Sequence, residues 1–578
     1  MPPRRLTLAS PGLGTLGTIA LLILAHAAAA ATPSSGSLSG TQPDLAWSGK
    51  PGQVTANTTC GGPSNSSCDN FRLTITPPSW AFSVDITATP SGVDDYDLEV
   101  YDSAGNLVGG SSELPGTAER VTLNNPAAGT YTVSVVNYVG LLPYAGEAKI
   151  LAQGANGASS AANLGFAVYP APPGVGENAG EPSIGVNWKS GNVFYIATLD
   201  TLRVRFDDCA TPAQATWEDK SFLTTSLLSL DPILFTDPVT GRTFVSQLAS
   251  KCSSMAYTDD DGESWLPSLG CGINSGVDHQ TVGGGPFAPP LTRSSGGLLY
   301  PHAVYYCSQD SVMAQCAVSL NGGVTFGLAV PMYSLLQCGG LHGHVKVGPD
   351  GTAFVPNKNC GGRQAVVVST NNGLSWQVRP VPGTVAGVWD PAAAAGSDGT
   401  LYIGMTNGGR PYVAVSYDHG TSWQALQDVG KALGIQNTAF PVMVAGDGDR
   451  AAFGFLGSAE AGDASGTDAG SSHVWYPYVA ITTDRGRTWE TVNVSPGDPV
   501  QRGDVCAQGT TCAAARNLLD FNDMAVDREG RILFAYADGC AGACVGGPPN
   551  TAGAKATIAR QTTGPRLFAA YDGTSSCH

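Results

Sequence analysis

An eight-residue pattern recurs five times in the C-terminal part of the chain. Its form is Ser/Thr-x-Asp/Asn-x-Gly-x-Ser/Thr-Trp/Phe, and one copy reads Ser369-Thr370-Asn371-Asn372-Gly373-Leu374-Ser375-Trp376. The other copies are residues 258–265 (TDDDGESW), 319–326 (SLNGGVTF), 416–423 (SYDHGTSW) and 482–489 (TTDRGRTW). The pattern suits a tight turn, because Asp or Asn caps backbone N–H groups, glycine takes a positive φ, and the aromatic ring can wedge between neighbouring units.

A second element, strand–turn–strand, precedes each copy. Residues 344–355 and 523–536 show it most clearly. Counting these elements gives seven, starting near Glu181, Asp231, Asp278, His344, Asp390, Phe440 and Asp523. Four-stranded units at this spacing can bury both faces only against their neighbours in a ring, so the repeats predict a seven-bladed β-propeller. Six blades is the alternative, if the first or last unit is an irregular strand pair.

The five copies are identified as Asp boxes (BNR repeats) of the sialidase superfamily. This resemblance implies a propeller that acts on glycans. It also implies a Tyr nucleophile paired with Glu, an Asp acid/base, and three arginines that clamp a carboxylate by bidentate hydrogen bonds. The chain departs from the family in its expected number of blades, which is usually six, and in lacking an F-R-I-P-like segment before the first blade.

Residues 41–152 predict a small β-sandwich ahead of the repeats. Alternating apolar and polar residues predict strands at 71–75, 82–86, 98–101 and 130–135. Residues 94–106 and 129–133 resemble the bacterial pre-peptidase C-terminal (PPC) domain, which implies an accessory role beside a secreted enzyme. Asp94, Asp95 and Asp97 could hold a structural calcium ion, with a solvated strand edge as the alternative. We expect no required cofactor.

The N-terminus has the features of a secretory signal. Arg4 and Arg5 precede an apolar stretch, and small residues suited to cleavage follow at 27–31. No later segment approaches the roughly 20 apolar residues of a transmembrane helix. The expected organisation is a signal peptide at 1–31, a linker at 32–40, the sandwich at 41–152, a second linker at 153–162 and the propeller at 163–578. We therefore expect a secreted protein that is soluble and monomeric.

The even number of cysteines, 14, indicates disulfide bonds. Disulfides persist in oxidising compartments, so they are consistent with an exported protein. The spacing of the cysteines favours short local bridges, although sequence alone does not fix connectivity. The expected pairs are Cys60–Cys68, Cys252–Cys271, Cys307–Cys316, Cys338–Cys360, Cys506–Cys512, Cys540–Cys544 and Cys209–Cys577.

Composition and charge exclude several classes of protein. Gly (75) and Pro (39) are abundant and only 13% of residues are charged, which excludes a coiled coil or helical bundle and favours an all-β chain. With 46 acidic residues against 29 basic ones, the net charge of −17 argues against a nucleic-acid partner.

Strand direction predicts which face of the ring could carry a site. In an antiparallel four-stranded unit, the turn between the third and fourth strands lies at the end opposite the start of the first strand. The boxes are such turns, so we expect them to be structural and the site to lie on the other face. Candidate catalytic residues there are Glu181, Asp231, Asp278, His279, Asp390, Asp523 and Tyr306. Candidate substrate-binding residues are His342, His344, Arg363, Arg410 and Arg516.

These residues support competing functions. A glycoside hydrolase would use paired carboxylates on extracellular glycans or glycoconjugates. A polysaccharide lyase would use His279, His342 and His344, with a neighbouring acid or as a metal site. A propeller that binds glycan or protein without catalysis is the third interpretation.

Overall fold

The computed structural model describes most of the chain. The described residues are 31–39, 42–50, 60–63, 65, 67–77, 82–112, 115–124, 126–152, 164–249, 252–270, 278–291 and 300–574. The expected signal peptide and second linker therefore lie almost wholly outside them. The chain divides into two compact units, Met1–Ala158 and Ser159–His578.

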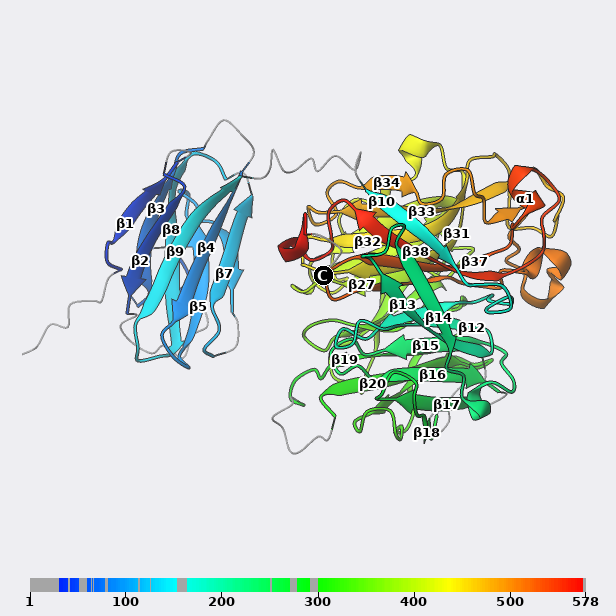
Figure 1. The fold of residues 1–578 in the computed structure, drawn as a ribbon. Helices are drawn as coiled ribbons and strands as arrows, with labels where there is room; N and C mark the ends of the chain where they lie inside the picture. Colours follow the sequence, from blue (N-terminus) through cyan, green and yellow to red (C-terminus); the bar gives the residue numbers. More distant parts are fainter. Residues whose placement is uncertain are drawn as a thin grey trace, which may run out of the picture. The chain divides into compact units, whose positions relative to one another are not determined.

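The first unit is a sandwich of two β-sheets (Figure 1). One sheet has the order β1-β3-β8-β5-β6 and the other β2-β9-β4-β7. The strands are β1 (Ser35–Leu38), β2 (Asp44–Gly49), β3 (Asp69–Ile75), β4 (Phe82–Pro90), β5 (Asp95–Tyr101), β6 (Leu107–Ser111), β7 (Glu119–Asn124), β8 (Gly129–Val139) and β9 (Tyr144–Ala152). All four expected strand segments are confirmed.

The core of the sandwich lies between its two sheets. Trp47 of β2 stacks on Phe71 of β3, with ring centroids 4.1 Å apart, so the two sheets meet through aromatic rings. Our expectation of a linker at 32–40 is wrong for residues 35–38, because β1 pairs in parallel with β3. Buried Leu38 explains this strand, since burying an apolar side chain stabilises it.

Two of the three acids proposed for calcium have structural environments in the sandwich. Asp94 Oδ2 accepts hydrogen bonds from the backbone N–H groups of Leu141 (2.9 Å) and Leu142 (2.5 Å). Asp97 is buried within β5, and burial raises its pKa. Asp94 thus caps a loop, and Asp97 lies in a packed environment that disfavours its charged form.

The second unit is all-β and consists mainly of four-stranded antiparallel sheets. Within its described residues there are seven. The first three are β11 (Ser183–Val186) with β12 (Val193–Ala197), β13 (Asp200–Asp207) and β14 (Gln214–Asp219); β15 (Pro232–Thr236) with β16 (Thr243–Leu248), β17 (Ser253–Thr258) and β18 (Leu266–Ser268); and β19 (Asp278–Pro286) with β20 (His302–Gln309), β21 (Met313–Ser319) and β22 (Val330–Ser334).

The next three are β23 (Lys346–Val347) with β24 (Ala353–Cys360), β25 (Arg363–Ser369) and β26 (Gln377–Pro380); β27 (Ala392–Ala395) with β28 (Leu401–Asn407), β29 (Arg410–Ser416) and β30 (Gln427–Asp428); and β31 (Asn437–Ala445) with β32 (Ala451–Ser458), β33 (Val474–Thr482) and β34 (Glu490–Asn493), to which β35 (Gln501–Arg502) adds. The last comprises β36 (Asp523–Val526), β37 (Ile532–Asp538), β38 (Lys555–Thr563) and β10 (Gly165–Pro170).

Helical structure is confined to short turns in the described residues. One α-helix, α1 (Ala543–Gly546), and five 3-10 turns occur. The 3-10 turns are Leu223–Thr225, Lys431–Leu433, Gly509–Thr511, Ala513–Arg516 and Ala569–Tyr571.

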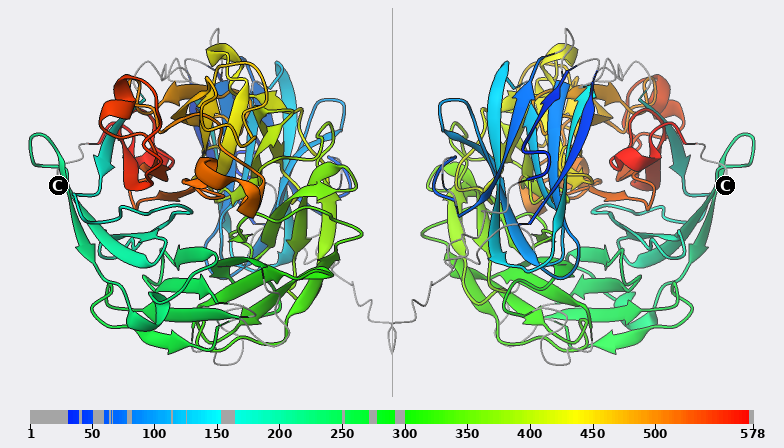
Figure 2. Two further views of the ribbon diagram at one scale, coloured as in Figure 1. Left: turned by 90° about the vertical axis from the view of Figure 1, so that its right-hand side faces the viewer. Right: turned by 90° about the vertical axis from the view of Figure 1, so that its left-hand side faces the viewer.

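The sheets are arranged around a common centre as a β-propeller (Figure 2). The first strand of each sheet contacts the first strand of the next, in the order β11, β15, β19, β23, β27, β31 and β36, and β36 contacts β11. The ring closes with β10, which pairs with β38 and so supplies the outer strand of the last sheet. We had not predicted a strand at residues 165–170.

The five copies of the eight-residue pattern, called boxes below, connect the third and fourth strands of five sheets, as expected. In the box of the fourth sheet, Ser369 Oγ accepts a hydrogen bond from the N–H of Gly373 and donates one to Asn371 Oδ1, both at 3.0 Å. The corresponding bond to glycine spans 2.7–3.0 Å in all five boxes. Trp376 packs against Tyr305 of the preceding sheet, which confirms a structural role for this box.

A buried ionic network joins the first sheet to the last. Asp208, which follows β13, accepts from Arg531 (2.5 Å) and from Arg560. Glu529 pairs with Arg531 and, at 2.9 Å, with Arg566. This network occupies the end of the last sheet, where β10 replaces a fourth strand reached through a box.

Five of the expected disulfides are present. They are Cys60–Cys68, Cys307–Cys316, Cys338–Cys360, Cys506–Cys512 and Cys540–Cys544. Cys209 and Cys252 are also disulfide-bonded, and their expected partners Cys577 and Cys271 lie outside the described residues.

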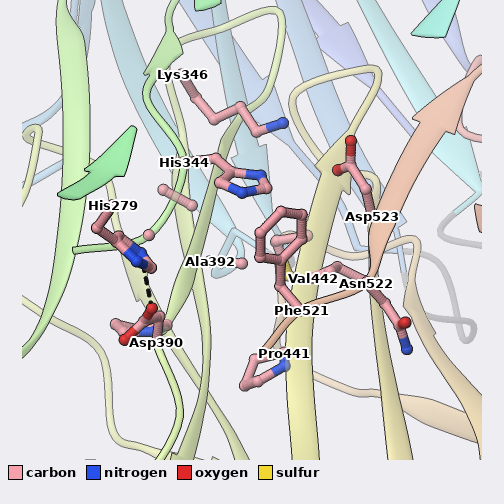
Figure 3. A pocket seen from close by; sticks show the side chains of 14 residues that line it. His279, His344, Lys346, Asp390, Ala392, Pro441, Val442, Phe521, Asn522 and Asp523 are labelled. Carbon is pink, nitrogen blue, oxygen red and sulfur yellow. Dashed lines mark ion pairs between the residues drawn. The ribbon is translucent and has the colours of Figure 1, made fainter. Parts of the chain in front are cut away.

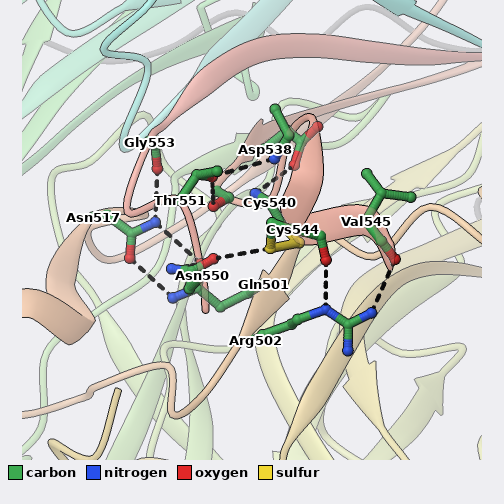
Figure 4. Close-up of a disulfide and its surroundings, with 12 residues drawn as sticks. Gln501, Arg502, Asn517, Asp538, Cys540, Cys544, Val545, Asn550, Thr551 and Gly553 are labelled. Carbon is green, nitrogen blue, oxygen red and sulfur yellow. Dashed lines mark hydrogen bonds between the residues drawn. A yellow bond between two sulfur atoms is a disulfide. The ribbon is translucent and has the colours of Figure 1, made fainter. Parts of the chain in front are cut away.

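The Cys540–Cys544 bridge stiffens the connection between β37 and β38 (Figure 4). Asp538 Oδ1 accepts the N–H of Cys540 at 2.9 Å. Arg502 donates to the carbonyls of Cys544 (2.7 Å) and Val545 (3.0 Å). A cross-link and charge-assisted bonds therefore hold a loop that would otherwise be long and solvated.

Candidate functional site

The starts of the inner strands converge at the end of the ring opposite the boxes. Two acids from successive sheets lie within electrostatic reach of each other there, Glu181 before β11 and Asp231 before β15. Both are buried, with relative exposures of 4% and 7%. Burial, and then the charges of Asp231 and Asp520, raise the pKa of Glu181 well above its usual range. These surroundings therefore favour the protonated form of Glu181.

Two further charged groups from the approach to β36 complete this acidic cluster. Arg516 binds both carboxylate oxygens of Asp520, at 2.5 and 2.6 Å. Arg516 also lies close enough to Glu181 to oppose the rise in its pKa. Of the three predicted arginines, Arg516 is thus the one placed beside a predicted acid.

Asp231 is held by the neighbouring sheet. Its Oδ2 accepts the N–H of Gln280 at 2.9 Å. The Gln280 side chain accepts from Ser246 at 2.7 Å and also from Ser253, whose hydroxyl bonds Tyr306 at 2.7 Å. Tyr306 therefore lies behind Asp231, at the far end of a hydrogen-bonded chain.

A charged pair from β19 and the approach to β27 lies next to these acids. His279 Nε2 donates to Asp390 Oδ2 at 2.8 Å, and Lys358 Nζ lies 3.1 Å from Asp390 Oδ1. Burial alone would lower the pKa of His279, but Asp390 outweighs it and raises the pKa to about 9. Burial alone would raise the pKa of Asp390, but Lys358 and His279 lower it. Both groups are therefore charged at neutral pH.

The other two predicted histidines are neutral. Burial and the charge of His279 lower the pKa of His342 to about 3, and its Nδ1 lies 3.0 Å from the carbonyl of Gly343. Burial and Lys346 lower the pKa of His344 well below its usual range. The ring of His344 meets Phe521 edge-on, with centroids 4.7 Å apart.

A narrow pocket opens among these residues (Figure 3). Its wall includes His279, His344, Lys346, Asp390, Phe521, Asn522 and Asp523. The volume of this pocket is about 30 Å³. This space suits a small polar group of a ligand rather than a whole sugar ring.

Asn522 and Asp523 contribute differently to that wall. Both polar atoms of the Asn522 amide are buried and have no protein partner in the described part of the chain. Such a buried amide calls for a water or a ligand group. Asp523 Oδ2 accepts the N–H of Ile184 at 3.1 Å, and burial raises its pKa. Asp523 thus links the last inner strand to the first.

Two lysines belong to the site but were missed by sequence reasoning. Lys346 lines the pocket, and Lys358 pairs with Asp390. Lys346 follows His344 by two residues, so the period of an extended chain places both on one side. That spacing could have identified Lys346, whereas nothing local marks Lys358.

Two candidate residues have strained backbones. Glu181 has φ 57° and His279 has φ 51°. The left-handed region is uncommon for residues other than glycine and costs on the order of 1–3 kcal/mol where the structure enforces it. Strain at both an acid of the first sheet and a histidine of the third is typical of a functional site.

Three other candidates, Tyr306, Arg363 and Arg410, are not gathered into this site. Tyr306 is buried, and burial raises its pKa, so its hydroxyl is poorly suited to act as a nucleophile. Arg363 is exposed at the start of β25. Arg410 pairs with Asp428 (3.0 Å) and Gln436 (2.9 Å) at the start of β29. Asp278 begins β19, and its side chain lies outside the described residues.

In the described residues, no group of three or more His, Cys, Asp or Glu side chains is arranged to hold a metal ion. None of the helices in this part of the chain has the length and apolar character needed to cross a membrane.

No family model and no curated protein sequence matches the chain. Among solved structures, it is similar to Hadza microbial sialidase Hz136, with 14% identity, 83% of this chain and 92% of that chain covered, and a TM-score of 0.32. A leech intramolecular trans-sialidase is 10% identical over 84% and 94% of the two chains, with a TM-score of 0.30. YCF48 bound to D1 peptide is 11% identical over 70% and 99%, with a TM-score of 0.36. At such scores these likenesses assign neither fold nor function.

Proposed function

We propose that this protein is an exported, sialidase-like glycoside hydrolase that acts on extracellular glycans. In this proposal the seven sheets are the blades of one Asp-box propeller, and the N-terminal sandwich is a PPC-like accessory domain. The local disulfides are consistent with an oxidising, extracellular compartment. The observation that carries the proposal is the pair of buried carboxyls, Glu181 and Asp231, at the end of the ring opposite the boxes.

The two carboxyls have the properties that glycoside hydrolysis needs. Burial and the acidic neighbours raise the pKa of Glu181, which suits it to give a proton to the glycosidic oxygen as the bond to the anomeric carbon breaks. Asp231 is the second carboxyl, which either attacks the anomeric carbon or takes the proton of the attacking water. Water supplies the hydroxyl of the new sugar end. If Asp231 attacks, Glu181 regains its proton from the water that hydrolyses the intermediate; if Asp231 takes the water proton, both carboxyls return to their starting states by proton exchange with solvent.

The pocket would position the substrate beside this pair. His279 and Lys346 are N–H donors on its wall, and Asn522 offers both a donor and an acceptor. Preorganised donors of this kind cost no rearrangement when charge develops in the transition state. The His279–Asp390 ion pair fixes the orientation of the imidazole, so Asp390 is a positioning residue.

One observation supports the alternative function of a polysaccharide lyase. His344 lines the pocket as a neutral imidazole, which could remove a proton from the carbon next to a uronate carboxylate. A lyase leaves an unsaturated sugar that absorbs in the ultraviolet, whereas a hydrolase leaves a saturated reducing end. The same reaction mixture therefore distinguishes the two.

The test is a glycan-panel assay of released reducing ends, with ultraviolet absorbance followed in parallel. We expect turnover by the wild type, at least a 100-fold loss in Glu181→Gln and in Asp231→Asn, and no new ultraviolet band. Glu177→Gln is the matched control, because this exposed acid lies on the same approach to β11 and pairs with Lys555. Glycan binding without turnover in the wild type would instead establish a non-catalytic propeller.

A further inference from the structure

A second pocket lies at the end of the ring that carries the boxes. It offers about 640 Å³, within the roughly 300–1,000 Å³ typical of small-molecule sites. Turns that follow the first strands supply Lys189, Val239 and Thr240, and the box of the second sheet supplies Asp259. Residues that flank β19 and β20 complete the wall: Pro286, Phe287, Tyr300, Pro301 and His302. We call this the box-face pocket.

A buried carboxylate organises one wall of the box-face pocket. Asp237, 1% exposed, accepts His302 Nδ1 at 2.7 Å and the Tyr300 hydroxyl at 3.1 Å. It also accepts the N–H groups of Val239 and Thr240, each at 3.1 Å. Asp237 therefore holds Tyr300 and His302 in fixed positions, and the second imidazole nitrogen, Nε2, remains for a ligand.

The acids at this pocket are already compensated. Asp259 is bound by Arg242 through two hydrogen bonds, at 2.7 and 2.6 Å. The same guanidinium lies over the ring of Tyr300, 4.8 Å from its centroid. Asp237 keeps its negative charge, but it is buried and accepts the four hydrogen bonds described above. A cationic ligand would therefore find no exposed, unpaired carboxylate among these residues.

The box-face pocket also carries an exposed positive charge, the ammonium group of Lys189. Lys189 is exposed, and its ammonium donates to the neutral carbonyl of Thr240 at 2.5 Å. That bond orients the amine but does not cancel its charge. The pocket thus combines a placed ammonium group with an aromatic and proline wall formed by Phe287, Tyr300 and Pro301.

We propose that the box-face pocket binds an anionic saccharide. A pyranose has an apolar face that can lie against the aromatic and proline wall, and hydroxyls that suit Nε2 of His302. The anionic group, a carboxylate or a sulfate, pairs with Lys189 through a charge-assisted hydrogen bond. Because this pocket lies at the box end of the sheets and the acid cluster at the other, binding here is separate from catalysis.

The experiment is calorimetric titration of the full-length protein with three trisaccharides. The first consists of galacturonic acid, the second is a sulfated galactose trisaccharide, and the third is neutral galactotriose. Each is titrated into the wild type, Lys189→Gln and the control Lys431→Gln, which alters another exposed lysine. The affinity assigned to the pocket is the part lost in Lys189→Gln.

We expect at least one anionic trisaccharide to bind about tenfold more tightly than the neutral one. Lys189→Gln should remove that advantage, while Lys431→Gln keeps it. Whichever anionic sugar depends on Lys189 identifies the group as carboxylate or sulfate. Equal affinity of all three sugars, or unchanged affinity in Lys189→Gln, would overturn the proposal. Glu181→Gln should retain the Lys189-dependent binding, so this result is independent of any failure of catalysis.

Discussion

Replacing Asp390 by Asn should reveal the His279–Asp390 pair through the pH dependence of stability. Asp390 raises the pKa of buried His279 from 6.5 to about 9. At about 1.4 kcal/mol per pKa unit, the change from 6.5 to about 9 corresponds to about 3–4 kcal/mol. Since the folded pKa is the higher one, this stabilisation is fully present below pH 6.5 and is lost as the pH rises through about 9.

The stabilisation contributed by Asp390 changes with pH in the opposite direction. The pKa of folded Asp390 lies below its usual 3.8, so its contribution is present above that value and is lost as the pH falls. The pair therefore stabilises the propeller most between about pH 4 and 6.5. In Asp390→Asn, burial favours neutral His279, so the variant gains no stability from protonating it.

The assay is urea unfolding followed by tryptophan fluorescence at about pH 5.5 and about pH 9.5. We expect the difference in unfolding free energy between wild type and Asp390→Asn to shrink by about 3 kcal/mol between these conditions. Asp428→Asn is the control, because it removes a carboxylate that pairs with Arg410 instead of a histidine. An equal difference at both pH values for Asp390→Asn would refute the electrostatic account of His279.

Three further changes test the framework. Asp208→Asn should cost about 1.5–3 kcal/mol in urea unfolding, because it removes one carboxylate partner from each of the buried arginines Arg531 and Arg560 at the ring closure; a cost below about 0.5 kcal/mol would contradict this. Gly373→Ala should cost more than Gly361→Ala, since both have positive φ but only the first Cβ would meet a side chain, Val318 at 2.6 Å; equal melting temperatures would refute the packing role of the box. Cys540→Ser should speed proteolysis between β37 and β38 relative to the wild type, and an unchanged cleavage rate would show that the bridge does not stiffen that loop.

The repeating pattern predicted most of the propeller because its determinants are local. Each box contains its own capping acid or amide, its glycine and its aromatic wedge, so residues such as Gly373 and Trp376 could be assigned without knowledge of the fold. The closing strand β10 could not, because Gly165–Pro170 becomes a strand only through its pairing with β38, almost 400 residues later.

In the candidate site, too, residues marked by their position in the sequence were predicted, and residues whose role depends on the fold were not. Glu181, Asp231 and His279 were found because each stands at a strand start. The three arginines were chosen because they lie in or next to loops of the predicted site face. Of these, only Arg516 lies beside a predicted acid. Lys358 was missed because its role depends on Asp390 in the next sheet, a pairing that the three-dimensional arrangement alone creates.

The most direct test of the central claim is the leaving-group dependence of Glu181→Gln. A general acid matters only when the departing oxygen needs a proton. We therefore predict that Glu181→Gln loses about 10²–10⁴-fold in kcat/KM on a natural glycan but stays within about tenfold of the wild type on a 2,4-dinitrophenyl glycoside of the same sugar. Equal losses on both substrates, or no loss on either, would contradict the role of Glu181 as the proton donor.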